Sequence, residues 1–193
     1  MQNKEVWENS KHLKYLKEKE ILKNNFKNVF SNMQKGSDLW LTPVYGVEII
    51  LPYLKKYQNK IVWCPFDTKE SNFVKILKKH NFNVVYSHLE NDQDFFKYEP
   101  KYWDLIVSNP PWSIKDKVLK RCYQLNKPFA LILPIHAISG KFRYSLFKKN
   151  KLQLLTSQNR ICFEGVASKN NRPPFESAYF CYNFLPESIC HEK

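Results

Sequence analysis

Blocks of apolar and polar positions alternate along most of the chain and predict strands and helices in turn. Short apolar runs with the length of buried strands occupy residues 61–63, 83–86, 104–108 and 129–135. Between them, residues 69–80 and 114–125 carry apolar side chains at spacings of three and four, as amphipathic helices do. This alternation predicts a Rossmann-like, doubly wound, mostly parallel α/β sheet.

The pattern changes towards both ends of the chain. Residues 4–35 predict a basic amphipathic helix, so we expect residues 1–36 to form a helical extension and residues 37–193 an α/β domain. Two more helices are expected over residues 47–57 and 142–149. The strand-like runs that follow are residues 152–156, 160–163 and 178–184. We expect the last two runs to form a C-terminal antiparallel hairpin.

Charge narrows the class of partner. The 193 residues include 31 Lys and Arg against 18 Asp and Glu, which gives a net charge of +13. This excess favours a polyanionic partner, nucleic acid first and an anionic membrane surface second, although a coding bias towards Lys would produce the same composition. Five scattered cysteines predict neither a disulfide framework nor a zinc site. With no leader peptide or long apolar stretch, we expect a cytoplasmic protein that does not cross a membrane, and no oligomeric state is predicted.

One loop concentrates the candidate chemistry. The strand-like run 104–108 leads directly into Asn109, Pro110, Pro111 and Trp112. Two consecutive prolines fix φ and remove two backbone donors, so this segment forms a rigid turn rather than more strand. It would present the Asn109 amide, the Pro110 carbonyl and the Trp112 ring, which together suit a flat group with an NH2, such as adenine. The alternative is an ordinary Pro-Pro turn with a packing tryptophan.

The loop resembles the [DNS]-P-P-[YFW] signature of S-adenosylmethionine-dependent amino-methyltransferases. A second segment, Asp38-Leu39-Trp40-Leu41-Thr42-Pro43, is similar to the Asp-x-Trp-x-Thr-Pro segment of phage Dam-like adenine-N6 DNA methylases. Both motifs occur in the family's order, and the resemblance spans roughly residues 37–185. It implies a class I methyltransferase fold, S-adenosylmethionine as cofactor and methyl transfer to the N6 amine of adenine in DNA. The catalytic residues it implies are Asn109, Pro110, Pro111 and Trp112.

The resemblance also implies a set of cofactor-binding residues. The expected contacts are Trp40, Thr42 and Pro43 against the cofactor, Asp67 at its methionine amine, Ser87 or His88 at the ribose, and Asp94 with Phe95 at the adenine. Each residue also has a purely structural reading. Thr42-Pro43 can start a helix, Asp67 can cap one, His88 can be incidental, and Asp94-Phe95 can be a solvated acid beside a core ring.

Basic residues near the C-terminal half are candidates for contact with nucleic acid. Lys169 and Arg172 fall in the loop between the last two strand-like runs, and Lys141 with Arg143 begins a predicted helix. One departure from the family supports another hypothesis, because the segment from Cys64 to Ser71 lacks the usual glycine-rich turn. The chain would then be a catalytically inactive, methyltransferase-like protein that binds nucleic acid. Methylation of an RNA base or a protein glutamine is a further alternative.

Overall fold

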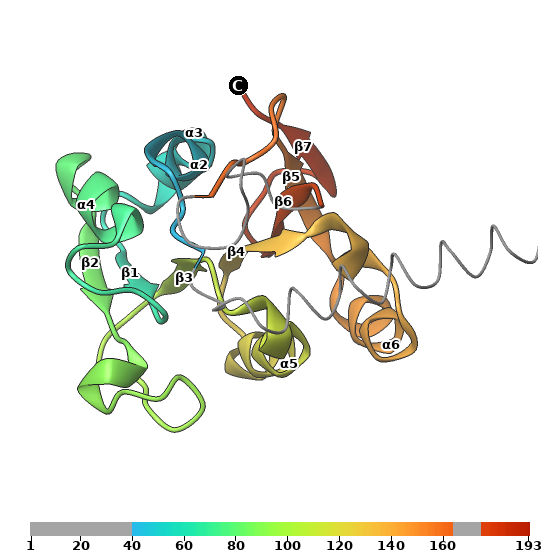
Figure 1. Ribbon diagram of the computed structural model, residues 1–193, viewed down its shortest axis with the longest axis horizontal. Coiled ribbons are helices and arrows are strands. Elements are labelled where there is room, and N and C mark those ends of the chain that lie inside the picture. Colours follow the sequence, from blue (N-terminus) through green and yellow to red (C-terminus); the bar gives the residue numbers. More distant parts are fainter. Residues whose placement is uncertain (1–39, 164–174) are drawn as a thin grey trace, which may run out of the picture. The chain divides into compact units, whose positions relative to one another are not determined.

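The computed structural model describes residues 40–163 and 175–193. The expected helix over residues 4–35, the boundary after residue 36, and both Lys169 and Arg172 lie outside these residues and stay predictions. The described part of the chain forms a seven-stranded sheet in the order β2-β1-β3-β4-β6-β5-β7 (Figure 1). The strands are β1 (Ile61–Cys64), β2 (Asn83–Tyr86), β3 (Leu105–Ser108), β4 (Phe129–Pro134), β5 (Gln153–Thr156), β6 (Ser177–Tyr182) and β7 (Ile189–His191).

Helices cover both faces of this sheet (Figure 1). They are α2 (Val44–Glu48), α3 (Leu51–Leu54), α4 (Asn72–Lys79), α5 (Lys115–Leu125) and α6 (Lys141–Asn150). Short 3-10 turns are η1 (Lys55–Tyr57), η2 (Leu89–Asn91), η3 (Trp112–Ile114) and η4 (Ile135–Ile138). No helix within residues 40–163 and 175–193 is long and apolar enough to cross a membrane.

The mixed, mostly parallel α/β sheet is confirmed. Strands β2, β1, β3 and β4 run parallel, in registers such as Val62 beside Leu105 and Ile106 beside Phe129. Every residue of β3 and β4 is buried. A parallel strand covered on both faces reads as a continuous apolar run, which is why these strands were visible in the sequence.

The expected C-terminal hairpin is wrong in its partners. Strand β6 does run antiparallel, but it lies between β4 and β5 and pairs with both. Residues 160–163 form no strand, because the backbone N–H of Cys162 donates to the Tyr45 hydroxyl at 2.6 Å instead of to a neighbouring strand. The burial of Ile161 and Phe163 produced the strand-like pattern. The sequence reading also missed β7, a three-residue edge strand parallel to β5.

The helix expected over residues 47–57 is broken into α2, α3 and η1. Pro52 stands in the first turn of α3, where a missing N–H is tolerated. In the interior of one continuous helix the same residue would break the hydrogen-bond ladder, so the helix is interrupted here. Helix α2 packs against β6 through the Tyr179 hydroxyl, which donates to the Gly46 carbonyl at 2.7 Å. Gly46 is suited to this crowded place, because a Cβ there would lie 3.0 Å from the Thr42 side chain.

Two chain crossovers leave the centre of the sheet in opposite directions. Helix α4 connects β1 to β2, which lies at one edge of the sheet. Helix α5 connects β3 to β4, which lies in the opposite direction along the strand order. Because such crossovers are almost always right-handed, helices that travel in opposite directions cover opposite faces, as Figure 1 shows for α4 and α5. The strands β1 and β3 therefore flank the topological switch point, where α/β sheets bind ligands at their carboxyl ends.

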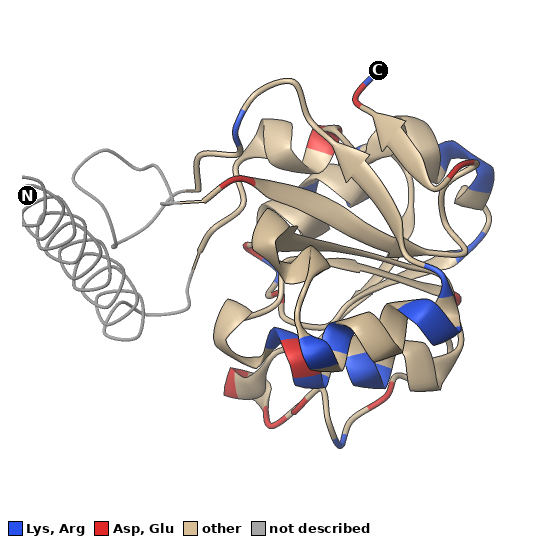
Figure 2. Cartoon of the chain, turned by 90° about the vertical axis from the view of Figure 1, so that its right-hand side faces the viewer, with Lys and Arg blue, Asp and Glu red and all other residues tan. Residues whose placement is uncertain are grey.

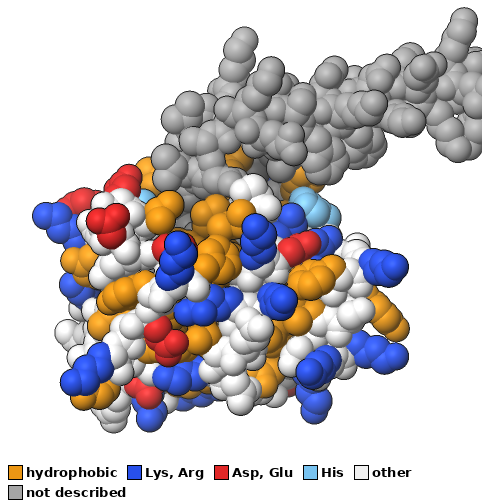
Figure 3. All heavy atoms as spheres, turned by 90° about the horizontal axis from the view of Figure 1, so that it is seen from below, with side chains coloured by type: hydrophobic (Ala, Val, Ile, Leu, Met, Phe, Trp, Pro, Cys, Tyr) orange, Lys and Arg blue, Asp and Glu red, His pale blue; other side chains and the backbone are white. Residues whose placement is uncertain are grey.

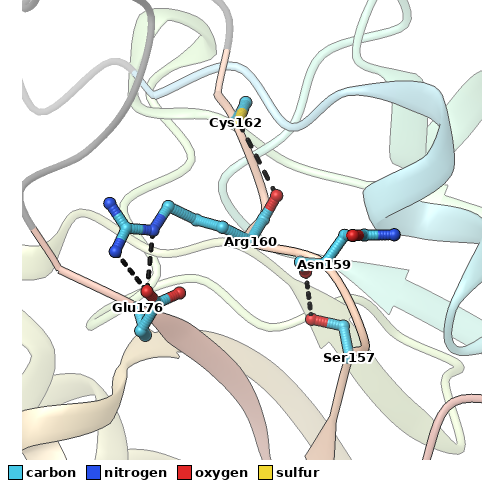
Figure 4. A network of polar contacts seen from close by, with 5 residues as sticks. All are labelled: Ser157, Asn159, Arg160, Cys162 and Glu176. Atoms are coloured by element: carbon cyan, nitrogen blue, oxygen red, sulfur yellow. Dashed lines mark hydrogen bonds and ion pairs between the residues drawn. The ribbon is translucent and has the colours of Figure 1, made fainter.

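The segments on either side of residues 164–174 are tied together by an ion pair. Arg160 donates through Nε to Glu176 Oε1 at 2.8 Å, and its Nη2 also contacts this oxygen (Figure 4). The Arg160 carbonyl accepts from the Tyr45 hydroxyl, which lies on α2. These contacts fix residues 160–163 beside α2 without a strand.

We predict that the buried hydrogen bond of the Tyr179 hydroxyl contributes more to the free energy of unfolding than the exposed hydrogen bond of Tyr182 on the same strand. Tyr179→Phe leaves the Gly46 carbonyl without its donor and should lower the free energy of unfolding by about 1–2 kcal/mol. The matched control Tyr182→Phe removes an exposed bond to Asn126 and should change it by less than about 0.5 kcal/mol. Urea denaturation of the two variants measures this difference, and equal losses would contradict the assignment.

Candidate functional site

A cavity of about 840 Å³ lies at the carboxyl ends of β1 and β3. Its walls come from residues 40–42, from the loop after β1 with the start of α4, and from the loops after β2 and β3. This is the size range of small-molecule and cofactor sites, and the location is the switch point. The predicted cofactor loop and the predicted amine loop therefore open onto one shared space.

The predicted site residues divide into those that line this cavity and those that lie behind its wall. The lining residues are Trp40, Thr42, Asp67, His88, Asp94, Phe95, Asn109 and Pro111. Pro43, Ser87, Pro110 and Trp112 are buried behind it. Most of the expected cofactor contacts are thus brought together, whereas half of the Asn-Pro-Pro-Trp loop is not exposed to the cavity.

Asp67 occupies the floor of the cavity between β1 and β3. Its side chain is only 7% exposed, and its Oδ2 accepts from the Ser108 hydroxyl at 2.6 Å. Burial raises the pKa of this carboxyl to about 6, although hydrogen bonds from Ser108 and Ser71 act in the opposite direction. It does not act as the cap of α4, because the N-cap position belongs to Ser71. A buried acid with a raised pKa in a cavity marks a functional candidate.

The loop after β2 divides the two expected ribose contacts. Ser87 is 1% exposed, and its hydroxyl accepts from the Trp63 indole at 3.0 Å, so it supports the core and does not line the cavity. His88 lines the cavity and caps η2, because its Nδ1 accepts from the Glu90 backbone at 3.3 Å. Of the two, only His88 is placed to meet a ligand.

Asp94 and Phe95 form one end of the cavity with two aromatic residues that sequence reasoning did not select. Phe66 and Phe96 line the cavity and pack against Phe95 at centroid distances of 4.9 and 5.5 Å. One Asp94 oxygen accepts from the Phe96 backbone at 3.0 Å, which fixes the carboxylate beside these rings. Each ring is next to a predicted site residue, but a single Phe in a loop carries no signal of which way it points.

Asn109 is held from both sides of its carboxamide. Its Nδ2 donates to the Trp40 carbonyl at 2.9 Å, and its Oδ1 accepts from the Trp112 indole Nε1 at 3.1 Å. Trp112 is 5% exposed and stacks on Trp40 with their ring centroids 5.9 Å apart, while Phe163 packs edge-on against both. Trp40 lines the cavity, whereas the expected platform Trp112 does not and is covered by the Trp40 ring.

The segment from Trp40 to Pro43 closes the cavity on this side. Thr42 lines it, and its carbonyl accepts from the Asn72 side chain at the start of α4 at 2.9 Å. Pro43 is buried and stands at the N-cap position of α2, so its role in the structure is to start that helix. Residues 38 and 39 of the expected motif lie outside the described residues.

The cavity wall is acidic in a strongly basic protein. Four carboxylates line it: Asp67, Glu70, Glu90 and Asp94. Among the described residues, Lys75 is the one lysine in the wall and pairs with Glu70 at 2.8 Å, and His88 lies 3.4 Å from Glu90. An excess of negative charge favours a cationic ligand and disfavours a phosphate chain inside the cavity.

The basic candidates on α6 differ in their availability. Arg143 donates through Nη1 to Asp116 and through Nε to the Ser139 carbonyl, both at 2.7 Å, so it ties α6 to α5. Lys141 is exposed at the start of the helix. Lys and Arg residues recur along α5 and α6 (Figure 2). The face seen from below has basic side chains with apolar ones between them (Figure 3). Among the described residues, no group of three or more His, Cys, Asp or Glu side chains could hold a metal ion.

Comparisons with known proteins leave the chain without an assigned family. No family model and no curated protein matches the sequence. Among solved structures, the fold is similar to a protein described as a modification subunit of a type I restriction enzyme from Vibrio vulnificus YJ016, with 11% identity and a TM-score of 0.45. The match covers 76% of this chain and 45% of that chain.

We predict that Asp67 makes the protein less stable as pH rises from about 4 to 6. The pKa of this carboxyl is higher in the folded state, so the folded state holds the proton over this interval and the free energy of unfolding decreases as the proton is lost. A shift from 3.8 to about 6 corresponds to about 2–3 kcal/mol.

Asp67→Asn should remove this dependence. Urea denaturation of both proteins at pH 4 and pH 7 gives the difference in their unfolding free energies at each pH. Between pH 4 and pH 7 the unfolding free energy of the variant should increase relative to that of the wild type by about 2–3 kcal/mol. A difference that does not change with pH would contradict the buried, raised-pKa state of Asp67.

Proposed function

We propose that this chain is an S-adenosylmethionine-dependent methyltransferase that acts on the exocyclic N6 amine of adenine in DNA. The observation that carries the proposal is that Asn109 and Asp67 open onto one cavity at the switch point of the sheet. The seven-stranded, mostly parallel sheet is consistent with a methyltransferase-like fold. A donor and an acceptor loop at one cavity is what a direct transfer between two bound molecules needs.

The charge of the cavity supports this choice of cofactor. S-adenosylmethionine carries a sulfonium and an ammonium group against one carboxylate, so its net charge is positive, and the acidic wall suits it. The buried carboxylate of Asp67 would receive the ammonium group, and Asp94 with Phe66 and Phe95 would hold the adenine ring. The segment from Cys64 to Ser71 would accommodate the cofactor without a glycine-rich turn, because its side chains already line a cavity of sufficient size.

The transfer itself asks for orientation more than for a reactive side chain. An adenine amine has its lone pair delocalised into the ring, so acceptors that bind its hydrogens favour a tetrahedral nitrogen. Asn109 Oδ1 has a second lone pair for this purpose, because the Trp112 indole uses only one. S-adenosylmethionine would supply the methyl group: the amine nitrogen held by Asn109 would replace sulfur at the methyl carbon and would give one proton to water. The chain's own contribution is to orient both partners and to exclude other nucleophiles.

We predict that Asn109→Ala lowers methyl transfer by a factor on the order of 10² to 10³ and changes the affinity for S-adenosylmethionine less than about threefold. The amine would lose its acceptor, whereas the acidic part of the cavity would be intact. Transfer of a labelled methyl group to DNA, RNA and protein, together with calorimetry, measures both effects. Gln58→Ala is the matched control, because that side-chain amide bonds to the His80 and Asn81 carbonyls, away from the cavity.

The outcomes separate the candidate functions. The proposal is supported if the wild type labels DNA and Asn109→Ala does not. If only RNA or only protein is labelled, that molecule is the acceptor and DNA is not. Full activity of Asn109→Ala would exclude the role of this residue.

A basic surface supports nucleic acid as the partner. Helix α6 contains four basic residues and no acid, and its residues Lys141, Tyr144, Lys148 and Lys149 are exposed. This observation also favours the second candidate function, a nucleic-acid-binding protein without catalysis. Both functions require the same electrostatic contact, and cofactor binding distinguishes them.

We predict that Lys141→Ala weakens binding to DNA and lowers the dependence of log K on log salt by about 0.7–0.9, because one phosphate contact is lost. Lys79→Ala, an exposed lysine at the end of α4 on the other face, is the control and should leave the slope unchanged. Fluorescence anisotropy with a labelled oligonucleotide over a range of salt concentrations measures both. Equal slopes for Lys141→Ala and the wild type would exclude α6 as the contact surface.

A further inference from the structure

The carboxamide of Asn109 has two partners of opposite kinds, one on each side. The Trp40 carbonyl is only an acceptor, and it lies 2.9 Å from Nδ2. The Trp112 indole N–H is only a donor, and it lies 3.1 Å from Oδ1. If the amide turned over, Oδ1 would face the carbonyl and Nδ2 would face the indole N–H, so both contacts would become repulsive. The two tryptophans therefore select one of the two orientations of the Asn109 amide.

The orientation of this amide decides what a flat amine meets in the cavity. A carboxamide oxygen accepts the hydrogens of an amine, whereas a carboxamide NH2 opposes them. A side chain that is free to turn would present the wrong group for part of the time. An indole N–H that holds the oxygen in place thus acts on the reaction without contact with the acceptor.

Trp112 has the surroundings of such a support and lacks those of a stacking surface. It is 5% exposed, it does not line the cavity, and Trp40 covers its face. Its N–H also points to the Ile132 carbonyl at 3.3 Å, which ties it to β4. The single indole N–H is therefore shared between a carbonyl of the sheet and the shorter bond to Asn109.

We propose that Trp112 is a positioning residue: its indole N–H holds the Asn109 amide with Oδ1 in the orientation that accepts the substrate amine, and Trp40 supplies the ring that faces the cavity. This inference rests on the proposed function, because the substrate amine is the reason for the orientation. It departs from the expectation that Trp112 stacks on the target base.

Trp112→Phe is the first variant of the test, because it keeps an aromatic ring between Trp40 and Phe163 and removes the N–H. The rate constant kcat for methyl transfer should fall about 10- to 100-fold, with the cofactor Kd and the KM for DNA changed less than about threefold. Trp103→Phe is the matched control, since it removes another buried indole N–H that donates to Glu99 at 3.0 Å and does not line the cavity. Its kcat should stay within about twofold of the wild type.

The second variant, Asn109→Asp, makes the inference sharper. A carboxylate has two equivalent oxygens, so its orientation no longer matters. The further change Trp112→Phe should then lower kcat less than about threefold in the Asn109→Asp background. The same large loss in both backgrounds would overturn the inference, because it would show that Trp112 acts through packing alone.

An NMR measurement tests the orientation independently of activity. In the wild type the Asn109 side chain should give one pair of NH2 signals, and the Trp112 indole N–H should be protected from hydrogen exchange. In Trp112→Phe the Asn109 pair should broaden or split. An unprotected indole N–H, or an unchanged Asn109 pair in the variant, would refute the role of Trp112. If the wild type transfers no methyl group to any acceptor, the proposed function fails, and these signals still decide whether Trp112 orients Asn109.

Discussion

A short hydrogen bond between two buried side chains connects the two loops on which the site depends. Ser108 at the end of β3 donates to Asp67 after β1 at 2.6 Å, and the two residues are 0% and 7% exposed. Because β1 and β3 flank the switch point, this bond fixes the floor of the cavity from both strands. It also holds an ionisable group that is almost fully buried, and this burial raises the pKa of Asp67 to about 6. The ionisation of Asp67 therefore affects both the stability of the fold and the charge that the cavity presents to a ligand.

The distribution of charge separates two tasks within one domain. The chain has a net charge of +13, yet among the residues that the structure describes four carboxylates and one lysine line the cavity. The exposed lysines of α6 would attract a polyanion to the outer surface, whereas the acidic cavity would attract a cation. A nucleic acid would therefore reach the site with a base and not with its backbone. This arrangement is the physical basis for preferring a methyl donor with positive charge over a nucleotide phosphate.

The sequence predicted the central part of the fold well, for physical reasons that can be named. Buried parallel strands leave continuous apolar runs, so residues 104–108 and 129–135 were recognised nearly to their ends. Residues 160–163 were misread because burial in an aromatic cluster resembles burial in a strand. Within the site, residue type and order predicted Asp67, Asp94 and Asn109 at the cavity. Tertiary packing decides that Trp40 covers a face of Trp112 and that Ser87 accepts a hydrogen bond from Trp63. No local sequence pattern encodes these contacts.

We propose that the acidic cavity between β1 and β3 binds a cationic nucleoside cofactor beside Asn109. Calorimetric titration of the full chain with S-adenosylmethionine at pH 7.5, repeated with Asp67→Asn, is the decisive measurement. We expect one saturable site in the wild type and an affinity at least about tenfold lower in the variant, because a buried charge contact is lost. Absence of binding at millimolar cofactor, or equal affinity in both proteins, would contradict it.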